Sequence, residues 1–170
     1  FRNTGTLRFE DKGLDWGFNT PSFSNGAAYG DLDNDGDLDL VVNNVNQEAF
    51  LYQNKAENQT PKHHYLSVTL KGKGQNTFAI GSTVTAYRGA EQLNFQFNPS
   101  RGFQSSVDYK MVFGLGQNAV IDSLVVLWPD RSKTVLPHPN VDAALQVSWE
   151  NSQNGKNGFA SNLESAEAAL

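Results

Sequence analysis

Residues 31–42 read Asp31-Leu32-Asp33-Asn34-Asp35-Gly36-Asp37-Leu38-Asp39-Leu40-Val41-Val42, and this stretch decides the fold of the first part of the chain. Aspartate occupies every second position of its first nine residues. Carboxylates this close together repel one another in a compact loop, and a hard divalent cation relieves that repulsion. Calcium takes about six to eight oxygen ligands, so the pattern predicts a Ca²⁺ site whose metal residues are Asp31, Asp33, Asp35, Asp37 and Asp39.

The loop is similar to the first half of an EF-hand, with side chains facing inward at its first, third and fifth positions and Gly36 allowing a sharp turn. An EF-hand carries a glutamate at its twelfth position, which here is Val42, and the residues that follow the loop favour a strand. The sequence therefore predicts a nine-residue loop that Asp39 closes before a strand. The alternative is a solvated acidic hairpin, because Asp, Asn and Gly all favour turns.

Outward from this loop, short apolar or alternating runs recur between clusters of Gly, Asn, Pro and Ser. Such a pattern predicts an all-β fold. The runs expected to form strands are 38–42, 49–52, 65–70, 81–87, 93–97, 124–128 and 144–149. Residues 124–128 are apolar on both faces, which favours a central strand, whereas residues 113–116 are expected to form a tight turn with Phe113 and Leu115 in the core.

Composition divides the chain into three parts. Residues 1–60 are rich in Asn and Asp and hold the predicted loop, and residues 61–150 hold the best-patterned strands. Residues 151–170 have few large apolar side chains, so we expect a flexible tail or linker there. The opening Phe1-Arg2-Asn3 reads like the middle of a domain, which suggests a piece of a longer protein.

Charge and composition exclude several classes of function. The net charge of −5 argues against nucleic acid as a partner, because phosphate binding calls for clustered Lys and Arg. Outside residues 31–39 the acidic residues equal the 13 basic ones, so the excess charge belongs to the loop. The absence of cysteine excludes disulfide scaffolds and thiol nucleophiles, and no apolar run is long enough to span a bilayer.

The stretch from Gly26-Ala27-Ala28-Tyr29-Gly30 through the loop to Leu40-Val41-Val42 resembles the FG-GAP (VCBS-type) repeat, which builds blades of calcium-binding β-propellers. The resemblance implies a partial propeller blade. It also implies side-chain ligation by Asp31, Asp33, Asp35 and Asp39, with Asp37 giving its backbone carbonyl.

The second part of the chain resembles the ASPIC/UnbV domain. The elements that carry the resemblance are Ile80-Gly81-Ser82-Thr83-Val84, Arg101-Gly102-Phe103-Gln104-Ser105-Ser106, Phe113-Gly114-Leu115-Gly116 and Leu124-Val125-Val126-Leu127-Trp128-Pro129-Asp130. That family usually has His before its Phe-Gly-Leu-Gly and Gly after its Trp-Pro-Asp, where this sequence has Val112 and Arg131. We expect a compact antiparallel β-sandwich or barrel-like domain here. The two resemblances in this order are similar to the cartilage acidic protein family.

These resemblances imply a secreted or cell-surface protein that binds Ca²⁺ and recognises a protein or glycan ligand without catalysis. The alternative function is a carbohydrate-binding or carbohydrate-processing accessory module of a bacterial surface protein, because the chain is rich in aromatic residues. Open sheet edges of a lone blade usually recruit partners, so a homodimer through those edges is a further expectation.

Overall fold

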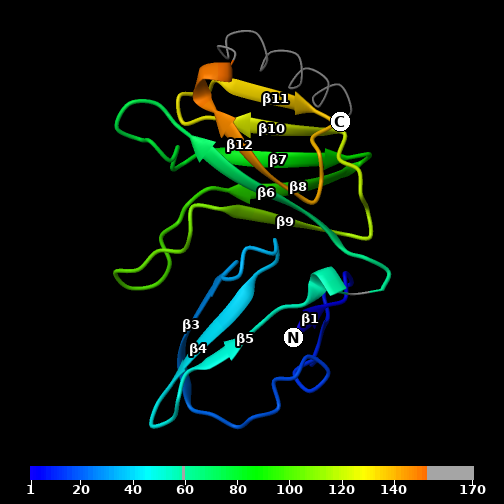
Figure 1. Ribbon diagram of the computed structural model, residues 1–170, viewed down its shortest axis with the longest axis vertical. Coiled ribbons are helices and arrows are strands. Elements are labelled where there is room, and N and C mark those ends of the chain that lie inside the picture. The colour runs from blue at the N-terminus through cyan, green and yellow to red at the C-terminus, as the bar shows by residue number, and fades with distance from the viewer. Residues whose placement is uncertain (59, 153–170) are drawn as a thin grey trace.

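The computed structural model describes residues 1–58 and 60–152, and it is all-β apart from two short 3₁₀ turns (Figure 1). The chain forms a β-sandwich, in the upper half of Figure 1, and a separate three-stranded sheet below it. The elements are β1 (Arg2–Asn3), β2 (Phe9–Glu10), β3 (Ser24–Gly30), β4 (Asp39–Asn44), β5 (Phe50–Tyr52), η1 (Ala56–Asn58), β6 (His64–Lys71), β7 (Thr83–Arg88), β8 (Glu91–Gln96), β9 (Met111–Gly116), β10 (Ser123–Leu127), β11 (Lys133–Pro137), β12 (Ala143–Ser148) and η2 (Trp149–Asn151).

The sandwich consists of two open sheets with strand orders β11-β10-β7-β8 and β12-β6-β9. Leu66 and Val68 of β6 are fully buried, as their shared position on one face of the strand predicts. Strand β10 lies inside its sheet, which confirms the central position expected for residues 124–128. The buried apolar core draws on both sheets, with Trp128 as its largest side chain.

Two expectations about the sandwich are wrong. It is not purely antiparallel, because β12 pairs with β6 in parallel, with Ala143 opposite Leu66. Residues 113–116 are not a turn: they form most of β9, although Phe113 and Leu115 are buried as predicted. The turn was predicted from the two glycines. The strand forms because Met111, Phe113 and Leu115 alternate along the chain and place their apolar side chains on one buried face.

The three-stranded sheet, in the order β3-β4-β5, has no apolar core of its own. The buried apolar side chains of the described residues all lie between Leu66 and Val147. In the first part of the chain the buried side chains are polar and include those of Asp31, Asp39 and Asn44. The sheet leaves β3 and β5 as edge strands, but a propeller blade and a homodimer through these edges stay predictions.

The predicted tail lies mostly outside the described residues, because only Asn151 and Ser152 of residues 151–170 belong to them. Asn151 ends the 3₁₀ turn η2, and Ser152 caps it. No helix in the described ranges is both long enough and apolar enough to cross a bilayer.

The position of the core predicts very different costs for two leucine truncations. Leu66→Ala removes a fully buried side chain and should lower the free energy of unfolding by about 2–5 kcal/mol. Leu51→Ala on β5, where the leucine is 68% exposed, should change it by less than about 0.5 kcal/mol. Urea unfolding followed by tryptophan fluorescence measures both, and equal costs would contradict this assignment of the core.

Candidate metal centre

The predicted loop connects β3 to β4, which pair as an antiparallel hairpin. Two residues of the loop adopt left-handed backbone conformations, Asn34 with φ +62° and Gly36 with φ +95°. Asparagine and glycine tolerate such angles better than other residues, so the sequence can curl tightly between the strands. The sharp turn expected at Gly36 is therefore confirmed.

The curl brings three of the five predicted carboxylates together. Asp31, Asp33 and Asp35 each offer one carboxylate oxygen, and these oxygens lie within 4.8 Å of one another. The arrangement follows from the spacing, because the first, third and fifth positions of a curling loop face its interior. Three converging carboxylate oxygens form part of the hard, anionic ligand set that Ca²⁺ prefers.

Each of the three carboxylates also accepts at least one hydrogen bond from the protein. The Asp33 Oδ2 accepts a hydrogen bond from the Gln53 side chain at 2.8 Å, and the Asp35 Oδ1 accepts the Asp37 N–H at 3.1 Å. The Asp31 Oδ2 accepts from the Lys110 ammonium at 3.0 Å. The Asp31 side chain is only 4% exposed, and its other oxygen, Oδ1, is buried without a hydrogen-bond partner.

Asp37 and Asp39 lie outside this cluster and anchor the loop to the chain that follows β5. The Asp37 Oδ2 accepts the Ala56 N–H at 2.9 Å, which leaves a ligand role for the Asp37 backbone carbonyl as a prediction. Asp39 is 3% exposed, and its two oxygens accept the N–H groups of Leu32 and Asn54 at 3.0 and 2.9 Å. In this structure Asp39 therefore closes the loop through the backbone, and its role as a metal ligand also stays a prediction.

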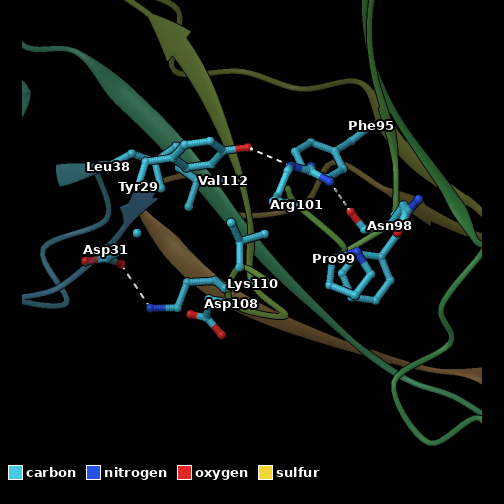
Figure 2. A pocket seen from close by; sticks show the side chains of 13 residues that line it. Tyr29, Asp31, Leu38, Phe95, Asn98, Pro99, Arg101, Asp108, Lys110 and Val112 are labelled. Atoms are coloured by element: carbon cyan, nitrogen blue, oxygen red, sulfur yellow. Dashed lines mark hydrogen bonds and ion pairs between the residues drawn. The ribbon is translucent and has the colours of Figure 1, made fainter. Parts of the chain in front are cut away.

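The sandwich contacts the loop at two points. Lys110, next to β9, donates to the Asp31 carboxylate (Figure 2). It also donates to the Asn34 Oδ1 at 3.2 Å. The Tyr65 ring of β6 lies directly against Gly36, so closely that a Cβ at Gly36 would overlap it. Neither Lys110 nor Tyr65 could be assigned to the loop from sequence, because no local pattern marks a contact between residues so far apart in the chain.

A third contact between the two parts of the chain lies beside Lys110. The Arg101 Nε donates to the Tyr29 hydroxyl at 3.4 Å, and its Nη1 donates to the Asn98 backbone carbonyl (Figure 2). The same Nη1 donates to the Ser100 backbone carbonyl. Tyr29 belongs to β3, one residue before the strand ends and the loop begins. The loop is therefore held to the sandwich from its strand as well as from its own residues.

A cavity of about 470 Å³ opens beside the loop, between the two parts of the chain. Asp35 and Asp37 line one side, while His63 and His64 line the other. His63 and His64 are adjacent in the sequence, and both line this cavity. His64 Nδ1 lies 2.9 Å from the Asp142 carboxylate, which belongs to the turn before β12.

The Asp142 carboxylate is the centre of a small charged network. The Lys62 ammonium donates to it at 2.8 Å and is the main cause that lowers the pKa of Asp142 to about 2. Hydrogen bonds from His64 and from the Tyr65 N–H lower this pKa further. Partial burial of the Asp142 carboxylate acts in the opposite direction and raises the pKa. The network fixes the start of β6 next to the chain that leads into β12.

The contact between Gly36 and Tyr65 predicts that Gly36→Ala destabilises the protein. A methyl group there would displace the Tyr65 ring, and the positive φ of Gly36 strains any L-residue, so we expect a loss of about 1–3 kcal/mol. Gly26→Ala on β3 is the matched control, because open space surrounds that position. Chemical unfolding measures both variants, and equal effects would contradict the close approach of Tyr65.

The Asp142 network predicts a specific pH dependence. Because the pKa of Asp142 in the folded protein, about 2, lies below its unfolded value of about 3.9, the ionised group stabilises the fold above about pH 4. This contribution is lost as the pH falls from about 4 to about 2. The stability difference between the wild type and Asp142→Asn should therefore shrink between pH 6 and about pH 2 in urea unfolding. An unchanged difference would contradict the ionised network.

Comparison with known proteins identifies the second part of the chain. Residues 72–154 match the profile of the family described as ASPIC and UnbV, a range that includes every strand from β7 to β12. No curated protein matches the chain. The resemblance of residues 26–42 to the FG-GAP repeat stays a prediction, while the expected resemblance to the ASPIC/UnbV domain is confirmed as a match over residues 72–154.

Proposed function

We propose that this protein is a calcium-binding β module in which Ca²⁺ fixes the loop between β3 and β4. The observation that carries the proposal is the convergence of the Asp31, Asp33 and Asp35 carboxylate oxygens within 4.8 Å. The buried Asp31 Oδ1 supports it independently, because a buried carboxylate oxygen without a partner is costly and a cation would satisfy it.

Calcium suits the loop better than magnesium. Magnesium requires near-ideal octahedral geometry and keeps several of its waters, whereas calcium accepts irregular sets of carboxylates and backbone carbonyls. In the proposal Asp31, Asp33 and Asp35 supply side-chain oxygens and Asp37 supplies its carbonyl. Asp39 completes the set in the FG-GAP resemblance, and in that case it would exchange at least one of its present backbone contacts for the ion.

The role proposed for the ion is structural. The three-stranded sheet has no apolar core, so its loop end needs another source of rigidity, and a cation shared by several residues supplies it. A rigid loop would hold the surface beside it in one shape for recognition of a protein or glycan ligand. We place this activity at the cell surface or outside the cell and without catalysis, in keeping with the resemblance to calcium-binding propellers.

The ring contacts among the described residues do not by themselves support the carbohydrate alternative. The parallel pair in the described ranges, Phe78 and Tyr109, stacks face to face with centroids 4.1 Å apart. The ring of Trp149 is covered by the Lys73 ammonium at 4.0 Å. The usual platform for a sugar is a pair of exposed rings in one plane. Binding assays on a panel of polysaccharides test the carbohydrate alternative directly.

The proposal predicts that calcium raises the melting temperature. Extracellular modules bind calcium with a Kd of about 10⁻⁴–10⁻³ M. At a calcium concentration ten times the Kd, binding stabilises the fold by about 1.4 kcal/mol. For a chain of this length we expect the melting temperature to rise by about 3–6 °C relative to chelator. Differential scanning calorimetry of the full chain in CaCl₂ and in EDTA measures the rise.

Matched aspartate variants show whether the loop is responsible for the calcium-dependent rise in melting temperature. Asp33→Asn combined with Asp35→Asn should abolish the calcium-dependent rise. Asp15→Asn, which removes an exposed carboxylate paired with Lys12, should retain it. Coincident melting curves of the wild type in calcium and in EDTA would refute the calcium site, and a rise that survives the double substitution would place calcium elsewhere.

A further inference from the structure

The positively charged side chain of Lys110, from the sandwich, already contacts the predicted metal loop. The Lys110 ammonium contacts the first residue of the loop, Asp31, and the fourth, Asn34, at 3.0 and 3.2 Å. Both members of the ion pair are largely buried, with 4% of the Asp31 side chain and 20% of the Lys110 side chain exposed. This is therefore no ordinary surface ion pair, which would be screened and worth little.

We propose that Lys110 is the residue that sets the affinity of the loop for a divalent cation, by competing with that cation for Asp31. The inference rests on the proposed calcium site and adds its regulation. A divalent ion and an ammonium held by one carboxylate repel each other strongly, because they lie only a few ångströms apart in a partly buried place. Each cation therefore weakens the binding of the other.

This competition links the loop to the sandwich. Lys110 belongs to the sandwich, next to β9, whereas Asp31 and Asn34 belong to the loop. By thermodynamic reciprocity, Lys110 lowers the calcium affinity by the same factor by which calcium loosens the Lys110 contact. Calcium thus replaces a contact across the two parts of the chain with one inside the loop, while the Tyr65 ring remains against Gly36.

Isothermal titration of the full chain with CaCl₂ tests the inference. Lys110→Gln should bind calcium at least about tenfold more tightly than the wild type, because it removes the competing charge. Lys110→Arg keeps the charge and should remain near the wild-type affinity. Lys73→Gln is the matched control, because it removes the same unit of charge just after the end of β6, where Lys73 covers Trp149. It should change the calcium affinity less than about twofold.

A second variant and a second readout guard against a folding defect in Lys110→Gln. Asn34→Gly removes only the weaker contact of Lys110 and suits the positive φ of that position, so it should raise the calcium affinity about two- to fivefold. In EDTA, Lys110→Gln should melt below the wild type, because Asp31 loses its charged partner, and calcium should then raise its melting temperature more than that of the wild type.

The outcomes separate the two proposals. If the wild type binds calcium and both Lys110→Gln and Asn34→Gly bind it with unchanged or lower affinity, the competition is refuted and the calcium site stands. If neither the wild type nor any Lys110 variant binds calcium at millimolar concentration, the calcium site itself is refuted. Binding by Lys110→Gln alone would support both, with Lys110 excluding the ion from the wild type.

Discussion

The crowding of carboxylates in one short loop is the constraint on which the organisation of the first part of the chain depends. Five aspartates within nine residues cannot remain close together unless donors or cations offset their charge. The structure recruits these donors from several places: backbone N–H groups of the loop and of the chain after β5, the Gln53 amide and the Lys110 ammonium. Segments that are distant in sequence therefore meet at this loop.

The loop in turn is what fastens the three-stranded sheet to the sandwich. The sheet fully buries no large apolar side chain, so the hydrophobic driving force on its side is weaker than in the sandwich. Its contacts with the sandwich are local and mostly polar: the Tyr65 ring on Gly36, the Lys110 ion pair and the hydrogen bond from Arg101 to Tyr29. An arrangement in which charged and polar contacts meet at one loop is sensitive to the charge of that loop.

Local patterns predicted much of this structure because the relevant forces act over a few residues. The alternation of Leu66, Val68 and Leu70 predicted the buried face of β6, and the Asp and Gly spacing predicted a tight loop that gathers Asp31, Asp33 and Asp35. The turn expected at residues 113–116 was a misreading of a local pattern, whereas the wrong direction of β12 came from long-range pairing. Nothing in the sequence near β12 reveals that it joins β6 in parallel, since register and direction depend on the partner strand.

The same limit applies to the candidate site. Lys110 is an ordinary lysine before an apolar strand, and it meets Asp31 only because β9 lies at the edge of the sheet that faces the loop. Tyr65 reads as one more aromatic residue of β6, although its ring lies against Gly36. Asp39 was assigned a role from its position in the motif that the structure does not show. The motif suggests an ion ligand, whereas the Asp39 oxygens accept backbone N–H groups.

The parallel pairing of β12 with β6 also sets an order of events during synthesis. The acidic loop leaves the ribosome before the sheet that supports it is complete, because that sheet needs Ala143–Ser148, which is made about a hundred residues later. At translation rates of about 5–20 residues per second, this interval lasts about 5–20 seconds. For that time β3, β4 and β5 have no surface to rest on, and their edges are open to other chains. The three-stranded sheet is therefore made before the sandwich that supports it is complete.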